Sequence, residues 1–193
     1  MLVNQNAFKE LSLRATEFEN GRSTHWQHEQ KNFEFDENSF ANVGPMGTFS
    51  KSTGLIAKIA HLSFQIPFRL YGLRYKDFWT IDKAAKKIST RQGRQYDLDL
   101  LRHTLTLAML LQHYKSTIKN NPICIIGDGY ANMASVILES LPQSKVVLIN
   151  LAKSLLVDFV CLRKAFPHLK IALVRTRKEL EESLFNEEIR ATI

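Results

Sequence analysis

Hydrophobic and polar positions change their spacing near residue 120, and this change divides the chain into two predicted regions. Before that point apolar residues recur at helical intervals, so helices are expected at residues 1–20, 54–64, 80–91 and 98–117. Residues 20–54 are rich in Asn, Gly, Ser and Glu with scattered Phe, which is typical of an irregular segment. The pattern predicts a mainly helical N-terminal region over residues 1–120.

After residue 120, short and almost wholly apolar runs alternate with helical patterns. The apolar runs predict strands at residues 123–127, 145–150 and 170–175, and the helical patterns lie at 131–141, 152–166 and 177–190. Strands that are apolar at nearly every position are typical of a parallel sheet covered on both faces. The sequence therefore predicts an α/β fold, with a partial Rossmann-like parallel sheet of about three strands in a domain over residues 121–193.

The composition narrows the class of protein. A chain that is 45% hydrophobic and 23% charged is typical of a globular fold and not of a disordered one. Its N-terminus resembles no signal peptide, and its longest apolar stretch, residues 105–111, is far shorter than a membrane span. Cys124 and Cys161 both lie in apolar runs. We therefore expect a reduced, cytoplasmic protein without a membrane span or a metal site.

The net charge of +7 comes from the middle of the chain. Residues 61–120 hold 11 Lys and Arg against 4 Asp and Glu, whereas the flanking regions are nearly balanced. Such a segment favours an anionic small molecule or glycan as partner. The alternative is that these cations are only the solvated faces of helices. No nucleic-acid-binding motif accompanies them, so no nucleic-acid partner is expected.

The first predicted strand leads directly into a glycine-containing turn and a helix. Gly127 allows a tight turn, Gly129 allows a ligand to approach the backbone, and the helix that follows offers unpaired amides. Asn150 ends the next strand, 23 residues after Gly127, where nucleotide-binding folds place a polar group against ribose. The spacing indicates a nucleotide or nucleoside site. The alternative is a tight strand–helix turn without a ligand.

The sixth position of the turn helps to choose the cofactor. A dinucleotide fingerprint has Gly or Ala there, whereas this chain has Asn132, which would crowd a pyrophosphate. This residue disfavours NAD(P) and favours a ligand without a pyrophosphate, such as S-adenosylmethionine.

The motif ICIIGDGYANMASVIL followed by KVVLINLAKSLLVDF resembles the first two motifs of class I S-adenosylmethionine-dependent methyltransferases. More narrowly, it is similar to sugar O-methyltransferases, a bacterial group tied to cell-surface polysaccharide synthesis. The helix at 151–156 and the aromatic segment around Trp26 also look similar to that group. The resemblance implies O-methylation of a sugar or polysaccharide precursor. It places the cofactor against the turn and the end of the next strand, at Gly127, Asp128, Gly129, Tyr130, Ala131 and Asn150.

The chain departs from the family pattern at three points. Ile125 and Asn150 stand where the family has acidic residues, and a full sheet of this class has seven strands. These departures leave open a non-catalytic, truncated relative that acts in assembly or regulation, and a second copy or another chain that completes the sheet. No catalytic base is assigned, and His25, beside Trp26, is the first candidate to test.

Overall fold

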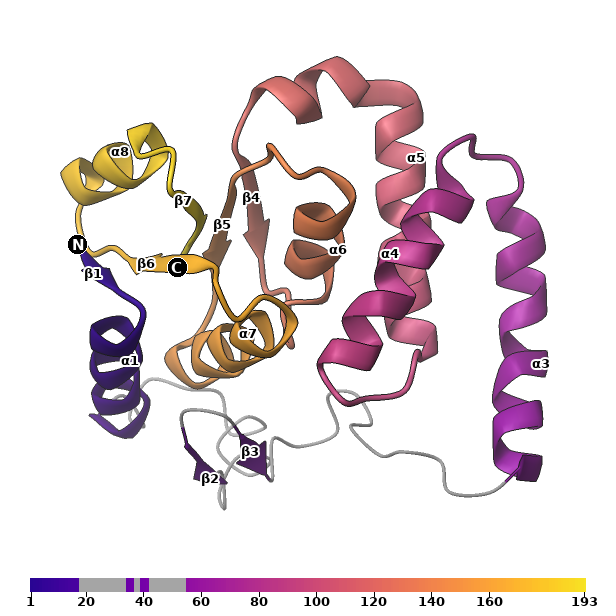
Figure 1. Ribbon diagram of the computed structural model, residues 1–193, viewed down its shortest axis with the longest axis horizontal. Helices are drawn as coiled ribbons and strands as arrows, with labels where there is room; N and C mark the ends of the chain where they lie inside the picture. The colour runs from indigo at the N-terminus through magenta and orange to yellow at the C-terminus, as the bar shows by residue number, and fades with distance from the viewer. Residues whose placement is uncertain (18–33, 37–38, 42–54) are drawn as a thin grey trace.

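The computed structural model describes residues 1–17, 34–36, 39–41 and 55–193, with the side chains of residues 55–58 left out. Within these residues, the first part of the chain contains short strands and long helices (Figure 1). Its elements are β1 (Leu2–Val3), α1 (Gln5–Glu17), β2 (Glu34–Phe35), β3 (Phe40–Ala41), α3 (Leu55–Gly72), α4 (Phe78–Arg91) and α5 (Leu98–Asn120).

The second part alternates strands with helices, as the hydrophobic pattern predicts. Its elements are β4 (Ile123–Ile126), α6 (Asn132–Ser140), β5 (Val146–Ile149), α7 (Ala152–Ala165), β6 (Lys170–Leu173), α8 (Arg177–Phe185) and β7 (Ile189–Thr192). The predicted α/β class is confirmed in its coarse form, an α/β chain with a mostly parallel sheet. The sheet has five strands in the order β1-β6-β7-β5-β4, with β1 antiparallel to β6 and the other pairings parallel.

The prediction for residues 177–190 was wrong at its C-terminal end. The helix stops at Phe185, and residues 189–192 form β7, which pairs with both β5 and β6. The segment Ile189–Thr192 contains β-branched residues that suit a strand and, apart from Arg190, is buried. The sheet therefore has four parallel strands instead of about three. β7 separates β5 from β6, whereas the first three strands of a doubly wound sheet are neighbours.

Helices cover the sheet and join it to the N-terminal region. α1 packs on α7, α4 packs on α6 and α7, and α5 packs on α4 and α6. The Phe8 ring of α1 meets Phe159 of α7 with their centroids 5.9 Å apart. α5 is interrupted at Tyr114, whose backbone is not helical, and its last turns lead into β4. The core is thus shared between the helical region and the sheet, and it includes buried Leu11, Ile81, Leu101 and Val146.

α3 lies at the edge of the molecule and packs mainly on α5 (Figure 1). It continues eight residues beyond the predicted end at residue 64, through Pro67. Among the described helices, none has both the length and the apolar character needed to cross a bilayer.

Candidate functional site

The glycine-containing turn lies where two neighbouring parallel strands end. Ile126 of β4 is in register with Ile149 of β5, and the Gly127 amide donates to the Ile149 carbonyl at 2.9 Å. This pairing brings the turn at residues 127–131 beside Asn150. The residues that the sequence analysis singled out for a cofactor therefore meet at one edge of the sheet.

The turn has an unusual backbone. Gly127 and Gly129 have φ of 72° and 58°, and Tyr130 and Ala131 also lie in the left-handed region, at 60° and 48°. A left-handed conformation costs a non-glycine residue about 1–2 kcal/mol, so two in succession mark a strained turn. A Cβ added to Gly127 would meet no atom within 4 Å. The backbone at Gly127 is therefore bare and faces open space.

Two buried carboxylates occupy the N-terminus of α6. Asp128 accepts hydrogen bonds from the Met133 and Ala134 amides, each at 2.8 Å. Asp158, which is completely buried on α7, accepts from the Ala131 amide at 2.7 Å. Three of the amides that the sequence analysis offered to a ligand are thus capped by the protein's own side chains.

These two carboxylates share a low-dielectric environment. Burial raises the pKa of Asp128 above its ordinary value, against the opposing effect of its two amide donors. Burial and the nearby charge of Asp128 raise the pKa of Asp158 to about 8. At neutral pH Asp158 therefore favours its protonated form.

Asn150 is tied into the same cluster. Its side-chain amide donates to Asp158 at 3.1 Å, and its carbonyl oxygen accepts from the Leu151 amide at 2.9 Å. Both ends of the side chain therefore have protein partners, and among the residues that the structure describes no acceptor meets its second amide hydrogen, which leaves that hydrogen for a ligand. Tyr130 is also turned inward, where its ring packs 5.9 Å from that of Phe40.

Exposed aliphatic side chains flank the bare turn. Ile126 is 79% exposed, and Ile149, its register partner, is 52% exposed on the same face of the sheet. Leu151, just beyond Asn150, is 47% exposed. We call these three side chains the apolar shelf. A flat apolar group such as a nucleobase would bury this shelf.

A polar network that the sequence analysis did not identify lies between α5 and α6. The Asn132 amide donates to Asp99 at 2.7 Å, and the Asn132 oxygen accepts from the Arg94 guanidinium. His103 lies with its Nε2 3.6 Å from the Asp99 carboxylate. This interaction, against partial burial, lowers the pKa of Asp99 to about 2. The i,i+4 spacing of Asp99 and His103 on a predicted helix was the sequence signal for this pair.

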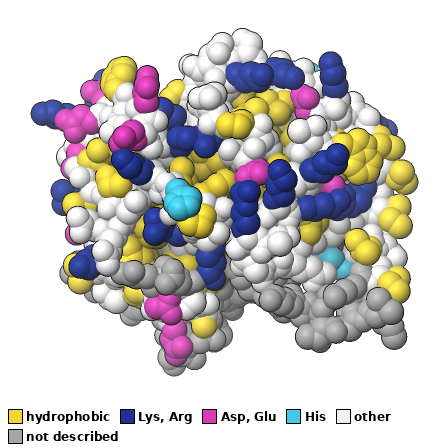
Figure 2. Space-filling model, in the orientation of Figure 1, with side chains coloured by type: hydrophobic (Ala, Val, Ile, Leu, Met, Phe, Trp, Pro, Cys, Tyr) yellow, Lys and Arg dark blue, Asp and Glu magenta, His cyan; other side chains and the backbone are white. Residues whose placement is uncertain are grey.

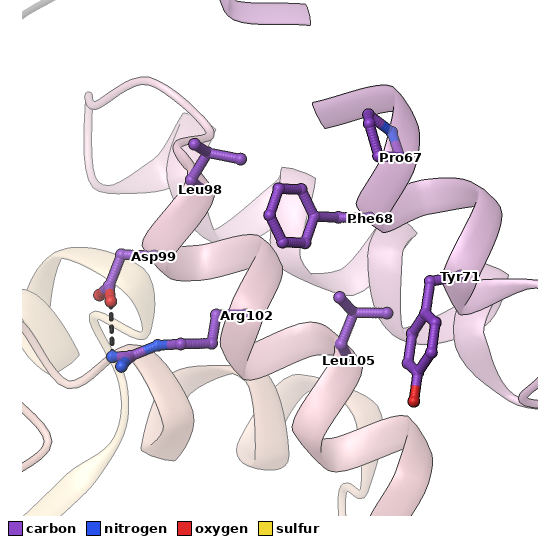
Figure 3. Close-up of a pocket in the computed structure, with 7 residues that line it drawn as sticks. All are labelled: Pro67, Phe68, Tyr71, Leu98, Asp99, Arg102 and Leu105. Carbon is purple, nitrogen blue, oxygen red and sulfur yellow. Dashed lines mark hydrogen bonds and ion pairs between the residues drawn. The ribbon is translucent and has the colours of Figure 1, made fainter. Parts of the chain in front are cut away.

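The network borders a cavity between α3 and α5 (Figure 3). The cavity has a volume of about 790 Å³ and is lined by Phe68 and Tyr71 of α3 and by Leu98 and Leu105 of α5. Asp99 and Arg102, hydrogen-bonded at 2.6 Å, close one end of it. An apolar space with a charged pair at one end fits a ligand that has both polar and apolar parts.

His25, the first catalytic candidate from the sequence, lies outside the described residues. Within the residues that the structure describes, no three His, Cys, Asp or Glu side chains gather as a metal site. Comparisons with protein-family models, with curated proteins and with solved structures gave no match.

Proposed function

We propose that the chain binds S-adenosylmethionine at the turn after β4 and transfers its methyl group to an oxygen of a sugar or glycan precursor. The observation that carries the proposal is the bare backbone of Gly127 at the joined ends of β4 and β5, with the apolar shelf beside it. Ligands of open α/β sheets bind at the carboxyl ends of parallel strands. In this proposal the described strands belong to a Rossmann-like methyltransferase sheet.

The charges behind the turn support this cofactor over a dinucleotide. Asp128 and Asp158 already accept from three amides at the start of α6, so a pyrophosphate there would compete with them and would face carboxylates. S-adenosylmethionine carries a cationic sulfonium and no phosphate. Gly127 and the remaining amide hydrogen of Asn150 would contact its polar part, and Ile149 and Leu151 its adenine.

The bound cofactor would supply an electrophilic methyl group. An acceptor hydroxyl oxygen would form the new C–O bond while the C–S bond breaks and its electron pair returns to sulfur. The hydroxyl proton needs a base, and His103 is our candidate because Asp99 orients its ring beside the network. Asp99 also accepts from the side chain of Asn132, the first residue of α6, so the histidine belongs to a network that reaches this helix.

The exposed cations of α4, which packs on α6, suit an anionic acceptor. Exposed cations on α4 include Lys83, Lys86, Lys87 and Arg91. Figure 2 shows Lys and Arg side chains spread over this part of the face. Three of the four meet acidic side chains at Asp82 or Glu139, so the net positive field is moderate. A sugar that carries a phosphate would be attracted to this face at low ionic strength.

One observation favours the alternative, a non-catalytic relative. The polar side chains expected to contact the cofactor, Asp128 and Asn150, both have protein partners. In that case the turn would serve only to join β4 to α6, and the strain in it would have no ligand-binding purpose.

Calorimetric titration with S-adenosylhomocysteine tests the proposal, with NADH as the comparison ligand. We expect a micromolar dissociation constant, about −8 kcal/mol, for S-adenosylhomocysteine and no binding of NADH. Gly127→Val, which projects a side chain into the open space at the turn, should weaken binding at least about 100-fold, or about 2.7 kcal/mol.

Gly93→Val is the matched control. Gly93 has a φ of 70° and nothing within 4 Å of an added Cβ, so both substitutions impose the same backbone strain. Binding by Gly93→Val should equal that of the unmodified chain. Failure of the folded protein to bind S-adenosylhomocysteine would favour the non-catalytic alternative, and binding of NADH in its place would favour the dinucleotide alternative.

A further inference from the structure

The cavity between α3 and α5 has walls of exposed aromatic and aliphatic side chains. Phe68 and Tyr71 of α3 are each about half exposed, and Leu98 of α5 is also exposed. Pro67 and Leu105 complete the apolar part of the lining. Apolar side chains that stay exposed inside a concave space offer a surface that a ligand would remove from water.

Helix α3 is held against the rest of the molecule by polar side chains. Gln65, which is 1% exposed, donates to the Tyr96 carbonyl at 2.9 Å. Arg69 pairs with the buried Asp82 at 2.7 Å. A surface helix usually packs its apolar side against the core. Because polar side chains take these inner positions on α3, its aromatic side chains line the cavity and stay exposed.

The polar end of the cavity has donors to offer and no spare acceptor. In Figure 3, Asp99 and Arg102 lie on one side of the cavity and Tyr71 on the other. The Asp99 carboxylate already accepts from Arg102 Nη2 at 2.6 Å and from the Asn132 amide at 2.7 Å. The Nε and Nη1 of Arg102 donate to no residue that the structure describes. A guanidinium with unused N–H groups favours a carboxylate or phosphate as its ligand.

The charges around the cavity also favour an anion. Residues 61–120 carry 11 Lys and Arg against 4 Asp and Glu. Each of the four acids is paired with a cation, in the pairs Asp77–Lys115, Asp82–Arg69, Asp97–Arg94 and Asp99–Arg102. The Arg74 guanidinium lies 4.6 Å from the centroid of the Tyr71 ring, and no acid among the described residues pairs with it. The excess charge of this segment is therefore positive at the cavity as well.

We propose that the cavity between α3 and α5 binds a small anionic amphiphile, a molecule with one apolar chain or ring and one carboxylate or phosphate end. The apolar part would lie against Phe68 and Leu98, and the anion would accept hydrogen bonds from Arg102. The volume of about 790 Å³ lies within the usual range of small-molecule sites, about 300–1,000 Å³. The proposal rests on α3 and α5 and does not depend on the proposed methyltransferase activity.

The hollow shape of the site favours a single molecule over a membrane surface. A bilayer would contact the apolar side chains that α3 exposes away from the cavity, which include Phe64, Ile66 and Leu70. A single amphiphile would instead contact the side chains that line the cavity, such as Phe68. Phe64 and Phe68 lie on the same helix and are both exposed, so they distinguish the two cases.

Calorimetric titration with three probes of equal chain length tests the proposal. The probes are decanoate, decanol and decyltrimethylammonium, each below the concentration at which it forms micelles. We expect decanoate to bind saturably, with one molecule per chain. Decanol, which lacks the anion, should bind at least about 10-fold more weakly, and the cationic probe should bind more weakly still.

Two pairs of variants locate the site. Phe68→Ala removes part of the cavity wall and should weaken decanoate binding at least about 10-fold, whereas Phe64→Ala should leave it unchanged. Arg102→Gln should bring decanoate down to the affinity of decanol. Lys119→Gln removes the same charge from an exposed position on α5 outside the cavity and should preserve the difference. Circular dichroism should show that all four variants are folded.

Several results would overturn the proposal. These are the absence of saturable decanoate binding, equal affinity for decanoate and decanol, and a loss in Phe64→Ala as large as that in Phe68→Ala. A chain that ignores free decanoate but sediments with vesicles containing anionic lipid would show that α3 contacts a membrane surface instead.

Discussion

Asp99 stays ionised to unusually low pH because of its interaction with His103, and this predicts a specific response to substitution. We expect His103→Gln to raise the pKa of Asp99 from about 2 toward its ordinary value near 4. A carboxyl whose pKa is lower in the folded than in the unfolded state stabilises the fold above pH ~4, and that contribution disappears as the pH falls toward 2. NMR titration of the carboxyl carbons measures the shift.

The exposed His113 on the same helix supplies the control, since His113→Gln should leave the Asp99 titration unchanged. A pKa that stays near 2 in His103→Gln would contradict the assignment. It would mean that Arg102 and Asn132, the other partners of Asp99, hold the charge without the histidine. His103 would then lose its support as an oriented base.

The sequence predicts a site residue only where its position relative to a neighbouring strand or helix indicates its role. Gly127 and Asn150 follow from strand ends, and the structure places them side by side. Asp158 was not predictable, because it reaches the Ala131 amide from a helix 27 residues away. The left-handed conformation of Tyr130 and Ala131 also has no local signal, because neither residue type favours it.

At the scale of elements, Gly72 determines how α3 meets α4. A Cβ at Gly72 would lie 2.6 Å from the ring of Phe78, which is fully buried. Gly72→Ala should therefore destabilise the fold by about 1–3 kcal/mol through overpacking, measured as a lower free energy of unfolding in urea. An exposed glycine near a helix end would behave in the opposite way, because replacing it with alanine favours the helix by about 0.5–1 kcal/mol.

The sign of the change in the free energy of unfolding therefore distinguishes overpacking against Phe78 from the ordinary gain of replacing a glycine. A more stable Gly72→Ala would show that Phe78 moves aside freely. Ser63→Ala, an exposed substitution on the same helix, is the control and should change the free energy of unfolding by no more than about 0.5 kcal/mol.

Most elements were predictable, and the errors have a common cause. The helices at residues 80–91 and 152–166 have clear apolar periodicity and were placed within about two residues, an ordinary boundary uncertainty. The helix ending at Gly72 was predicted too short, because polar Gln65 is buried there while apolar Ile66 and Leu70 are exposed, the reverse of the usual pattern. β7 was missed because a run of four residues after an acidic helix is too short for its hydrophobic periodicity to indicate a strand. Its pairing with β5 and β6 is tertiary information.

At the scale of the whole molecule, the sheet depends on its last strand. β7 lies between β5 and β6, so it alone connects β4 and β5 to β6 and β1 among the described strands. Ala191, at its centre, is fully buried and is in register with Val146 on one side and Ile171 on the other. The sheet therefore reaches its final arrangement only when residues far apart in the sequence have met, which is typical of slower folding.

Removal of β7 should consequently disrupt the sheet as a unit. A chain truncated after Asn186 loses the hydrogen bonds of β7 to both neighbours and exposes their buried edges. We expect it to lose cooperative unfolding in urea and the protection of β5 and β6 amides from hydrogen exchange. Phe185→Ser is the control, because it changes a side chain that is 85% exposed and lies just before the truncation point. The full-length chain with this substitution should unfold like the unmodified chain. A truncated protein that kept its protected amides in β5 and β6 would show that these strands can pair directly, in the neighbouring order of a doubly wound sheet.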